Sequence, residues 1–284
     1  MHRLELPSGL EIALDAWGPE SNQPVVLLHG GGQTRHAWRS AGQRLGDAGY
    51  RALAPDLRGH GDSAWDAEGE YGYDALAEDL VGFLREADVR RPALVGASLG
   101  GAVSLLSVGE GLLDAAALVV VDTAPRLEQS GVSNLRSFMT QKPEGFASLD
   151  EVADAIAAYN PHRRRSSNLA GLAKNVRVDG GGRLHWHWDP RFMSPTREPM
   201  DWERRQRRME ACARSLTLPT LLVRGGLSDI LSEEGAAGFL ELCPHAEYEN
   251  ITGASHMVAG DRNDRFSSAV IDFLARVAPP DLAG

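Results

Sequence analysis

The chain has 284 residues, of which 43% are hydrophobic and 24% charged, so it can bury a sizeable core and is neither disordered nor fibrous. Its 39 acidic residues outnumber its 29 basic ones, and a net charge of −10 argues against nucleic-acid and membrane partners. The two cysteines are far apart in the sequence and predict neither a disulfide framework nor a zinc site. The sequence has no apolar run of secretory or membrane-spanning length, so we expect a cytoplasmic protein.

Short apolar runs alternate with helix-like stretches over the first 122 residues. The apolar runs do not alternate with polar residues, which is typical of strands buried on both faces of a parallel sheet. The alternation of strands and helices predicts an α/β fold with a doubly wound, mostly parallel sheet. Strands are predicted at 11–16, 25–28, 51–54, 93–95 and 115–121, and helices at 37–48, 73–87 and 99–108.

This rhythm stops after Asp122. The next 90 or so residues contain helix-like pieces, a glycine turn and an aromatic patch, without a clear buried strand. Strand signals return near residue 220 and again near 248. We therefore expect one core domain, formed by residues 1–122 and 216–284, interrupted by a mainly helical cap at 123–215.

The string Gly96-Ala97-Ser98-Leu99-Gly100 lies directly after a predicted strand and directly before a predicted helix. This context favours a nucleophile elbow over a glycine-rich turn with an incidental serine. The chain must reverse sharply at Ser98, and the two glycines let strand and helix approach without Cβ clashes. The serine then stands at a helix N-terminus, where the helix dipole favours developing negative charge.

Several separated motifs resemble those of the α/β-hydrolase family, and in particular its capped branch of small-molecule esterases, carbon–carbon bond hydrolases and cofactor-free haloperoxidase-like enzymes. The resemblance covers nearly the whole core, whereas the insertion matches only in position. The motifs follow one another in family order: His29-Gly30-Gly31-Gly32, the loop 56–63, the elbow at Ser98, the segment 224–229, and Gly253-Ala254-Ser255-His256.

The resemblance implies a catalytic triad in the chain order Ser, Asp, His. Ser98 would be the nucleophile, and His256 the base that removes its proton. Asp229 would be the acid that orients the histidine, because it follows the strand after which the family usually carries this residue. Asp122, at the end of the preceding strand, is a rival that we disfavour. A structural alternative for Asp229 is to cap the next helix.

The resemblance also implies an oxyanion hole formed by the backbone N–H groups of Gly31 and Leu99. Glycines in the loop after His29 let the main chain approach a substrate closely. A purely structural turn is the alternative for Gly31.

Aromatic and histidine side chains near the predicted site and in the insertion are candidates for the substrate pocket. Trp38 could equally belong to the core, and the insertion's aromatic residues could either roof an apolar substrate or pack the cap on the core. The candidates are His36, Trp38, Trp186, His187 and Trp188.

Two arginine-rich runs, 163–165 and 204–208, lie in the insertion. Either run could hold a substrate carboxylate, but we favour solvated helix faces paired with neighbours such as Glu203 and Glu210. We assign no catalytic role to the loop 58–63.

Serine at the elbow argues against epoxide hydrolases and haloalkane dehalogenases, which need an aspartate there. The leading prediction is a serine hydrolase that cleaves a carboxylic ester, lactone or thioester of a small molecule through an acyl-enzyme. Carbon–carbon bond hydrolysis of a ketone-bearing ring-cleavage product by the same triad is the alternative, and a small-molecule receptor on this fold is a remote one. No cofactor or metal is expected, and the chain should be a monomer or a homodimer.

Overall fold

The computed structural model describes residues 1–161, 165, 169–193, 201–256, 258 and 263–280. Its centre is an eight-stranded sheet with the strand order β1-β2-β4-β3-β5-β6-β9-β10, in which β1–β2 and β2–β4 are antiparallel and the other pairs are parallel. The strands are β1 (His2–Glu5), β2 (Glu11–Trp17), β3 (Pro24–Leu28), β4 (Arg51–Pro55), β5 (Ala93–Ala97), β6 (Ala117–Val121), β9 (Thr220–Gly225) and β10 (Glu247–Ile251).

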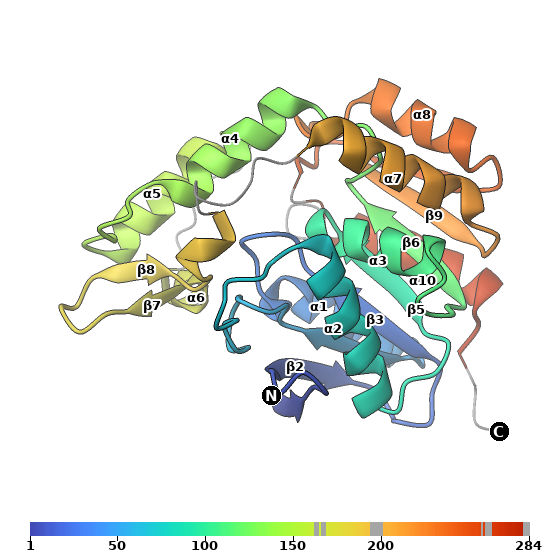
Figure 1. Ribbon diagram of the computed structural model, residues 1–284, viewed down its shortest axis with the longest axis horizontal. Coiled ribbons are helices and arrows are strands. Elements are labelled where there is room, and N and C mark those ends of the chain that lie inside the picture. The colour runs from blue at the N-terminus through green and yellow to red at the C-terminus, as the bar shows by residue number, and fades with distance from the viewer. Residues whose placement is uncertain (162–164, 166–168, 194–200, 257, 259–262, 281–284) are drawn as a thin grey trace.

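Helices cover both faces of this sheet (Figure 1). Residues of α2, α3, α7 and α8 share one apolar cluster with one face of the strands, and residues of α1 and α10 share a second cluster with the other face. These helices are α1 (Arg39–Asp47, preceded by the 3₁₀ helix η1, Arg35–Trp38), α2 (Tyr73–Glu86), α3 (Leu99–Gly109), α7 (Trp202–Ser215), α8 (Glu233–Leu242) and α10 (Asn263–Val277).

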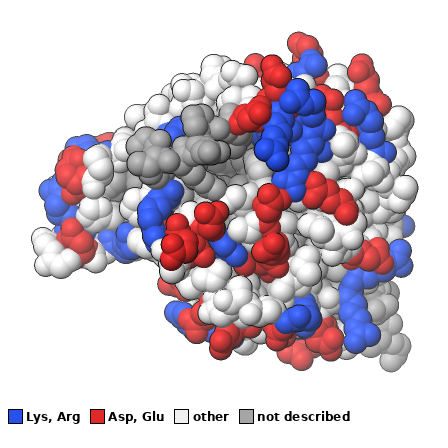
Figure 2. Space-filling model, viewed as in Figure 1, with Lys and Arg blue, Asp and Glu red and all other residues white. Residues whose placement is uncertain are grey.

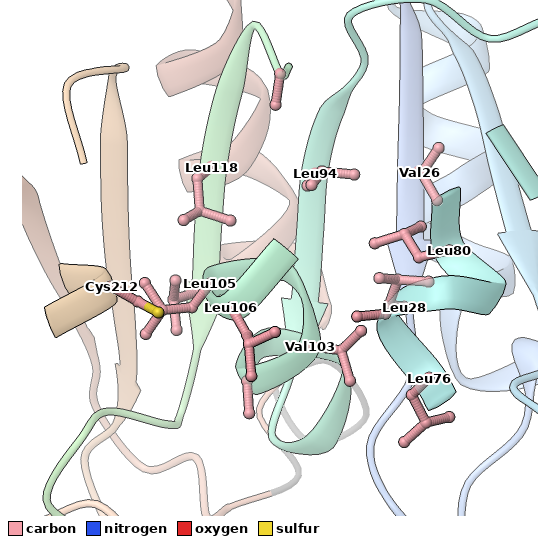
Figure 3. Packing of buried hydrophobic residues seen from close by; sticks show 14 of the residues in the cluster. Val26, Leu28, Leu76, Leu80, Leu94, Val103, Leu105, Leu106, Leu118 and Cys212 are labelled. Carbon is pink, nitrogen blue, oxygen red and sulfur yellow. The ribbon is translucent and has the colours of Figure 1, made fainter. Parts of the chain in front are cut away.

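The continuous apolar runs of the central strands follow from this three-layer packing. Successive side chains of a strand point to opposite faces, so Val26 and Leu28 of β3 join the first cluster while Val25 and Leu27 join the second. Figure 3 shows the first cluster, where the strand residues meet side chains of α2 and α3. The predicted doubly wound α/β fold is confirmed.

Between β6 and β9 the chain forms a separate lobe, which Figure 1 shows to one side of the sheet. A third apolar cluster, rich in aromatic residues, packs this lobe and joins it to Tyr71 of the core. A two-stranded antiparallel sheet lies within it, which the sequence did not predict. The elements are α4 (Gln129–Thr140), α5 (Leu149–Tyr159), α6 (Leu169–Leu172), η2 (Ala173–Asn175), β7 (Val176–Val178), β8 (Leu184–Trp186) and η3 (Pro190–Met193).

Helix α7, which the sequence prediction grouped with the insertion, packs against the core helix α3. Cys212 of α7 lies so close to Gly109 of α3 that a Cβ on this glycine would be 2.4 Å from the Cβ of Cys212. In Figure 3, Cys212 lies beside Leu105 and Leu106 of α3. The lobe therefore comprises α4 to η3, and it is called the cap from here on. Helix α7 belongs to the helical layer over the sheet.

Most arginines of α7 have partners, as expected for a helix face that pairs with acidic neighbours, but Arg205 is buried and donates to Tyr73 Oη and the carbonyl oxygen of Pro125. Arg207 pairs with Glu203 in the same helix, and Arg208 pairs with Asp74 and Glu110 of the core. Figure 2 shows basic atoms over this region bordered by acidic ones. Arg163 and Arg164 lie outside the described residues. None of the described helices is long and apolar enough to cross a membrane.

Candidate active site

Ser98 sits at a sharp reversal between β5 and α3. Its backbone has φ = 48° and ψ = −110°, a strained conformation for a residue other than glycine. A Cβ on Gly96 would lie 2.4 Å from the carbonyl oxygen of Gly100, and one on Gly100 would lie 2.3 Å from the oxygen of Leu28. Only glycine at both positions permits this turn, which has the backbone geometry expected of a nucleophile elbow.

His256, in the loop after β10, pairs with Asp122 at the end of β6. Nδ1 of His256 lies 2.6 Å from Oδ2 of Asp122, and both side chains are at least nine-tenths buried. An ionised carboxylate only accepts hydrogen bonds, so Nδ1 carries the proton and Nε2 keeps its lone pair. An imidazole in this tautomer can accept a proton at Nε2.

The expectation that Asp229 orients His256 is corrected by this pairing. Asp229 is exposed in the loop after β9, and His256 bonds to Asp122 instead. The loop after β9 supplies donors to Asp122, because β6 and β9 are neighbours and their carboxyl ends meet. Gly225 N donates to Oδ1 of Asp122 over 2.8 Å, and Ser228 Oγ donates to Oδ2 over 2.5 Å.

The backbone N–H groups of Gly31 and Leu99, both near Ser98, have no acceptor among the described residues. The neighbouring amides are occupied, since Gly30 N donates to Gln33 Oε1 over 3.0 Å and Gly32 N donates to His60 Nε2 over 3.1 Å. The loop is thus fixed on both sides of Gly31. A Cβ built on Gly30 would lie 3.3 Å from the Cβ of Ser98, so this loop runs close to the serine.

Ser98 and His256 both line a cavity of about 450 Å³ between the core and the cap. Its cap side is aromatic: Trp186 and Trp188 stack with ring centroids 5.0 Å apart, and Phe138 stacks on Tyr159 at 4.5 Å. All four of these residues line the cavity. Such a surface suits an apolar or aromatic ligand group.

The cap also contacts the loop that carries His256. Asn160, which ends α5, donates from Nδ2 to Oγ of Ser255 over 2.9 Å. Tyr159, one residue earlier, has a buried hydroxyl without a hydrogen-bond partner in the described residues. Burial, with the nearby carboxylates of Asp229 and Asp122, raises the pKa of Tyr159, so its hydroxyl stays protonated and available as a donor.

Three of the five predicted pocket residues line the cavity: His36, Trp186 and Trp188. Trp38 instead packs in the core against Phe266, with ring centroids 5.7 Å apart. His187 is buried behind the cavity wall, where its Nδ1 accepts a hydrogen bond from Gly61 N over 2.9 Å. These two assignments are corrected. The cavity residues of α4 and α5, such as Phe138 and Tyr159, were not predicted.

His29, His60 and His187 form a buried group beside the loop 30–33. Burial lowers the pKa of His29 to about 4 and that of His60 to about 3, and it also lowers the pKa of His187. Neutral rings can accept backbone N–H groups: His29 Nε2 accepts from Leu57 N over 2.9 Å. These histidines therefore hold loops in place. Among the described residues, no cluster of three or more His, Cys, Asp or Glu could hold a metal ion.

A family model described as "Alpha/beta hydrolase family" matches residues 25–269. The chain belongs to this family. It is 32% identical over 258 residues to the esterase Rv0045c of Mycobacterium tuberculosis, covering 87% of this chain and 80% of that one. It is 27% identical to the 3-hydroxybutyrate-oligomer hydrolase of Cupriavidus necator, covering 88% of each.

Among solved structures, an E-2-(acetamidomethylene)succinate hydrolase superposes with a TM-score of 0.83, covering 96% of this chain and 98% of that one. The two sequences are 22% identical, so this similarity concerns the fold alone. Together the family and its hydrolase relatives confirm that the chain is a hydrolase.

Proposed function

We propose that this hydrolase cleaves a carboxylic ester, lactone or thioester of a small molecule through an acyl-enzyme on Ser98. The observation that carries the proposal is the hydrogen bond between His256 and Asp122 beside a cavity that Ser98 also lines. With Nδ1 bound to a buried carboxylate, His256 has its other ring nitrogen free to act as a base.

In the first half of the reaction, Oγ of Ser98 attacks the carbonyl carbon while Nε2 of His256 takes the hydroxyl proton. The negative charge that develops on the carbonyl oxygen is stabilised by the N–H groups of Gly31 and Leu99. Asp122 stabilises the imidazolium. As the bond to the leaving group breaks, His256 returns the proton to the departing oxygen or sulfur.

In the second half, His256 takes a proton from a water molecule, whose oxygen attacks the acyl carbon. The same two N–H groups stabilise the second oxyanion, and the proton on His256 passes to Oγ of Ser98 as the acid leaves. One water is consumed; an ester or thioester releases one acid and one alcohol or thiol, and a lactone releases one hydroxy acid. The aromatic wall formed by Phe138, Trp186 and Trp188 favours substrates with an apolar or aromatic part.

The test is hydrolysis of 4-nitrophenyl esters of graded acyl length by the wild type, Ser98→Ala and a control, Ser133→Ala, which alters an exposed serine on α4. We expect turnover of at least one ester, a loss of roughly 10⁴-fold or more in kcat for Ser98→Ala, and an unchanged rate for the control. A wild type that is inert towards every ester, or a Ser98→Ala variant that keeps its rate, would overturn the proposal.

A further inference from the structure

The charged residues that line the cavity have one sign. Arg39, Arg165 and Lys174 line it together with His36 and His256, and no Asp or Glu stands among the described lining residues. This is unexpected in a chain with ten more acidic than basic residues. A random sample of its surface would contain more carboxylates than cations, so the lining is selectively cationic.

Two of these cations have no acidic partner among the described residues. Arg165 is neutralised by Asp150 at 2.7 Å and Asp154 at 2.5 Å. Arg39 and Lys174, by contrast, form no ion pair or side-chain hydrogen bond within the part of the chain that the structure describes. Both side chains are exposed yet line the cavity, so they lie where it opens to solvent.

Arg39 and Lys174 come from the two parts of the molecule that enclose the cavity. Arg39 begins α1 in the core, and Lys174 lies in η2 of the cap. Lys174 is close enough to His36 that its charge, after burial and Arg35, helps to lower the pKa of that ring. The nearby carboxylate of Asp15 is already engaged, 3.3 Å from Nε of Arg35. No described residue therefore neutralises the positive charge of Arg39 and Lys174 at the opening.

We propose that the substrate is an ester that carries a negatively charged group, and that Arg39 and Lys174 bind this group while the scissile carbonyl lies at Ser98. The proposal rests on the esterase function above and names its substrate class. Guanidinium and ammonium groups bind carboxylates and phosphates alike, so the shared chemistry is an anion at the far end from the ester. The apolar chain between would contact the aromatic wall.

The test compares three substrates of matched length: mono-4-nitrophenyl adipate, its ω-phosphonate analogue, and the neutral 4-nitrophenyl heptanoate. Wild-type kcat/KM should favour one or both anionic esters, and the better of them identifies the anion. Arg39→Gln and Lys174→Gln should each lower kcat/KM for the anionic ester by about threefold, and the double variant by about tenfold, because exposed ion pairs are weak. The preference, which is kcat/KM for the anionic ester divided by kcat/KM for the neutral ester, should fall by the same factors.

The matched control is Arg136→Gln, which removes an exposed cation of α4 that does not line the cavity. It should leave the preference intact, whereas raising the salt concentration to about 0.5 M should reduce it in the wild type. If the wild type hydrolyses the neutral ester as well as the anionic ones, or if the double variant keeps the anion preference, the inference is wrong and the esterase function stands. If no ester is hydrolysed, both fail.

Discussion

Replacing Asp122 with Asn should abolish most of the activity while leaving the fold in place. The carboxylate of Asp122 accepts from Gly225 N at Oδ1, and from Ser228 Oγ and His256 Nδ1 at Oδ2. An Asn that keeps its oxygen towards Gly225 N turns its NH₂ group towards Nδ1 of His256. The imidazole must then accept at Nδ1 and carry its proton on Nε2, where it cannot remove the proton of Ser98.

The flipped amide would restore the active tautomer, but its NH₂ group would face the N–H of Gly225 and leave two buried donors opposed, at a cost of about 1–3 kcal/mol. A neutral amide also no longer stabilises the imidazolium. We therefore expect a loss of roughly 10²- to 10⁴-fold in kcat, which corresponds to about 2.7–5.5 kcal/mol of transition-state stabilisation. Asp229→Asn, which changes the exposed carboxylate that the sequence suggested, should cost less than about threefold in the same 4-nitrophenyl ester assay.

Circular dichroism and thermal melts of both variants would separate a catalytic loss from unfolding. The reasoning is refuted if Asp229→Asn loses the larger share of the activity, or if folded Asp122→Asn retains a rate within about tenfold of the wild type. Either result would mean that another acid orients His256 during turnover.

Because burial lowers the pKa of His29, His60 and His187, the free energy of unfolding should decrease as the pH falls from 6.5 towards 4. In this range the unfolded chain binds protons that the buried rings do not. Each strongly shifted histidine therefore lowers the free energy of unfolding by about 1.4 kcal/mol per pH unit. Urea unfolding at pH 7, 6 and 5 measures this pH dependence, which should be weaker in His187→Gln than in the wild type. An equal pH dependence in the two proteins would contradict the assignment of His187 as a buried, neutral ring. Gly100→Ala should destabilise the protein by about 1–3 kcal/mol or more, because its Cβ would collide with the backbone of Leu28, whereas Gly238→Ala, in an open position of α8, should stabilise it by about 0.5–1 kcal/mol. Thermal melts that rank the two glycine variants in the opposite order would count against the packing at the elbow.

The elements that the sequence predicts well are those whose burial is fixed by local pattern. The central strands are apolar on both faces, and helices such as 73–86 place apolar residues three and four apart, so their positions follow from the sequence. Strand β1 was missed because its residues are largely exposed, and β7 and β8 because three residues carry little periodicity. The residues of α4 and α5 that line the cavity could not be predicted, because they depend on how the cap packs against the core. This packing consists of long-range contacts.

The candidate site divides in the same way. Ser98 and His256 lie in short motifs whose backbone geometry is set by adjacent glycines. The acid depends on which of two neighbouring strand ends faces the histidine, and this is a long-range relation. One signal was available: Asp122 directly follows a wholly buried strand, and a buried carboxylate needs donors, which the glycine and serine of the loop 225–228 supply.

The hydrogen bond from Asn160 to Ser255 links two parts of the molecule that otherwise have separate tasks. Asn160 belongs to the cap, and Ser255 immediately precedes His256. A displacement of α5 relative to the core would break this bond, which lies one residue from His256. The cap therefore supplies one of the restraints on the loop that bears His256, so a substitution in the cap can alter the orientation of this imidazole without changing Ser98, Asp122 or His256.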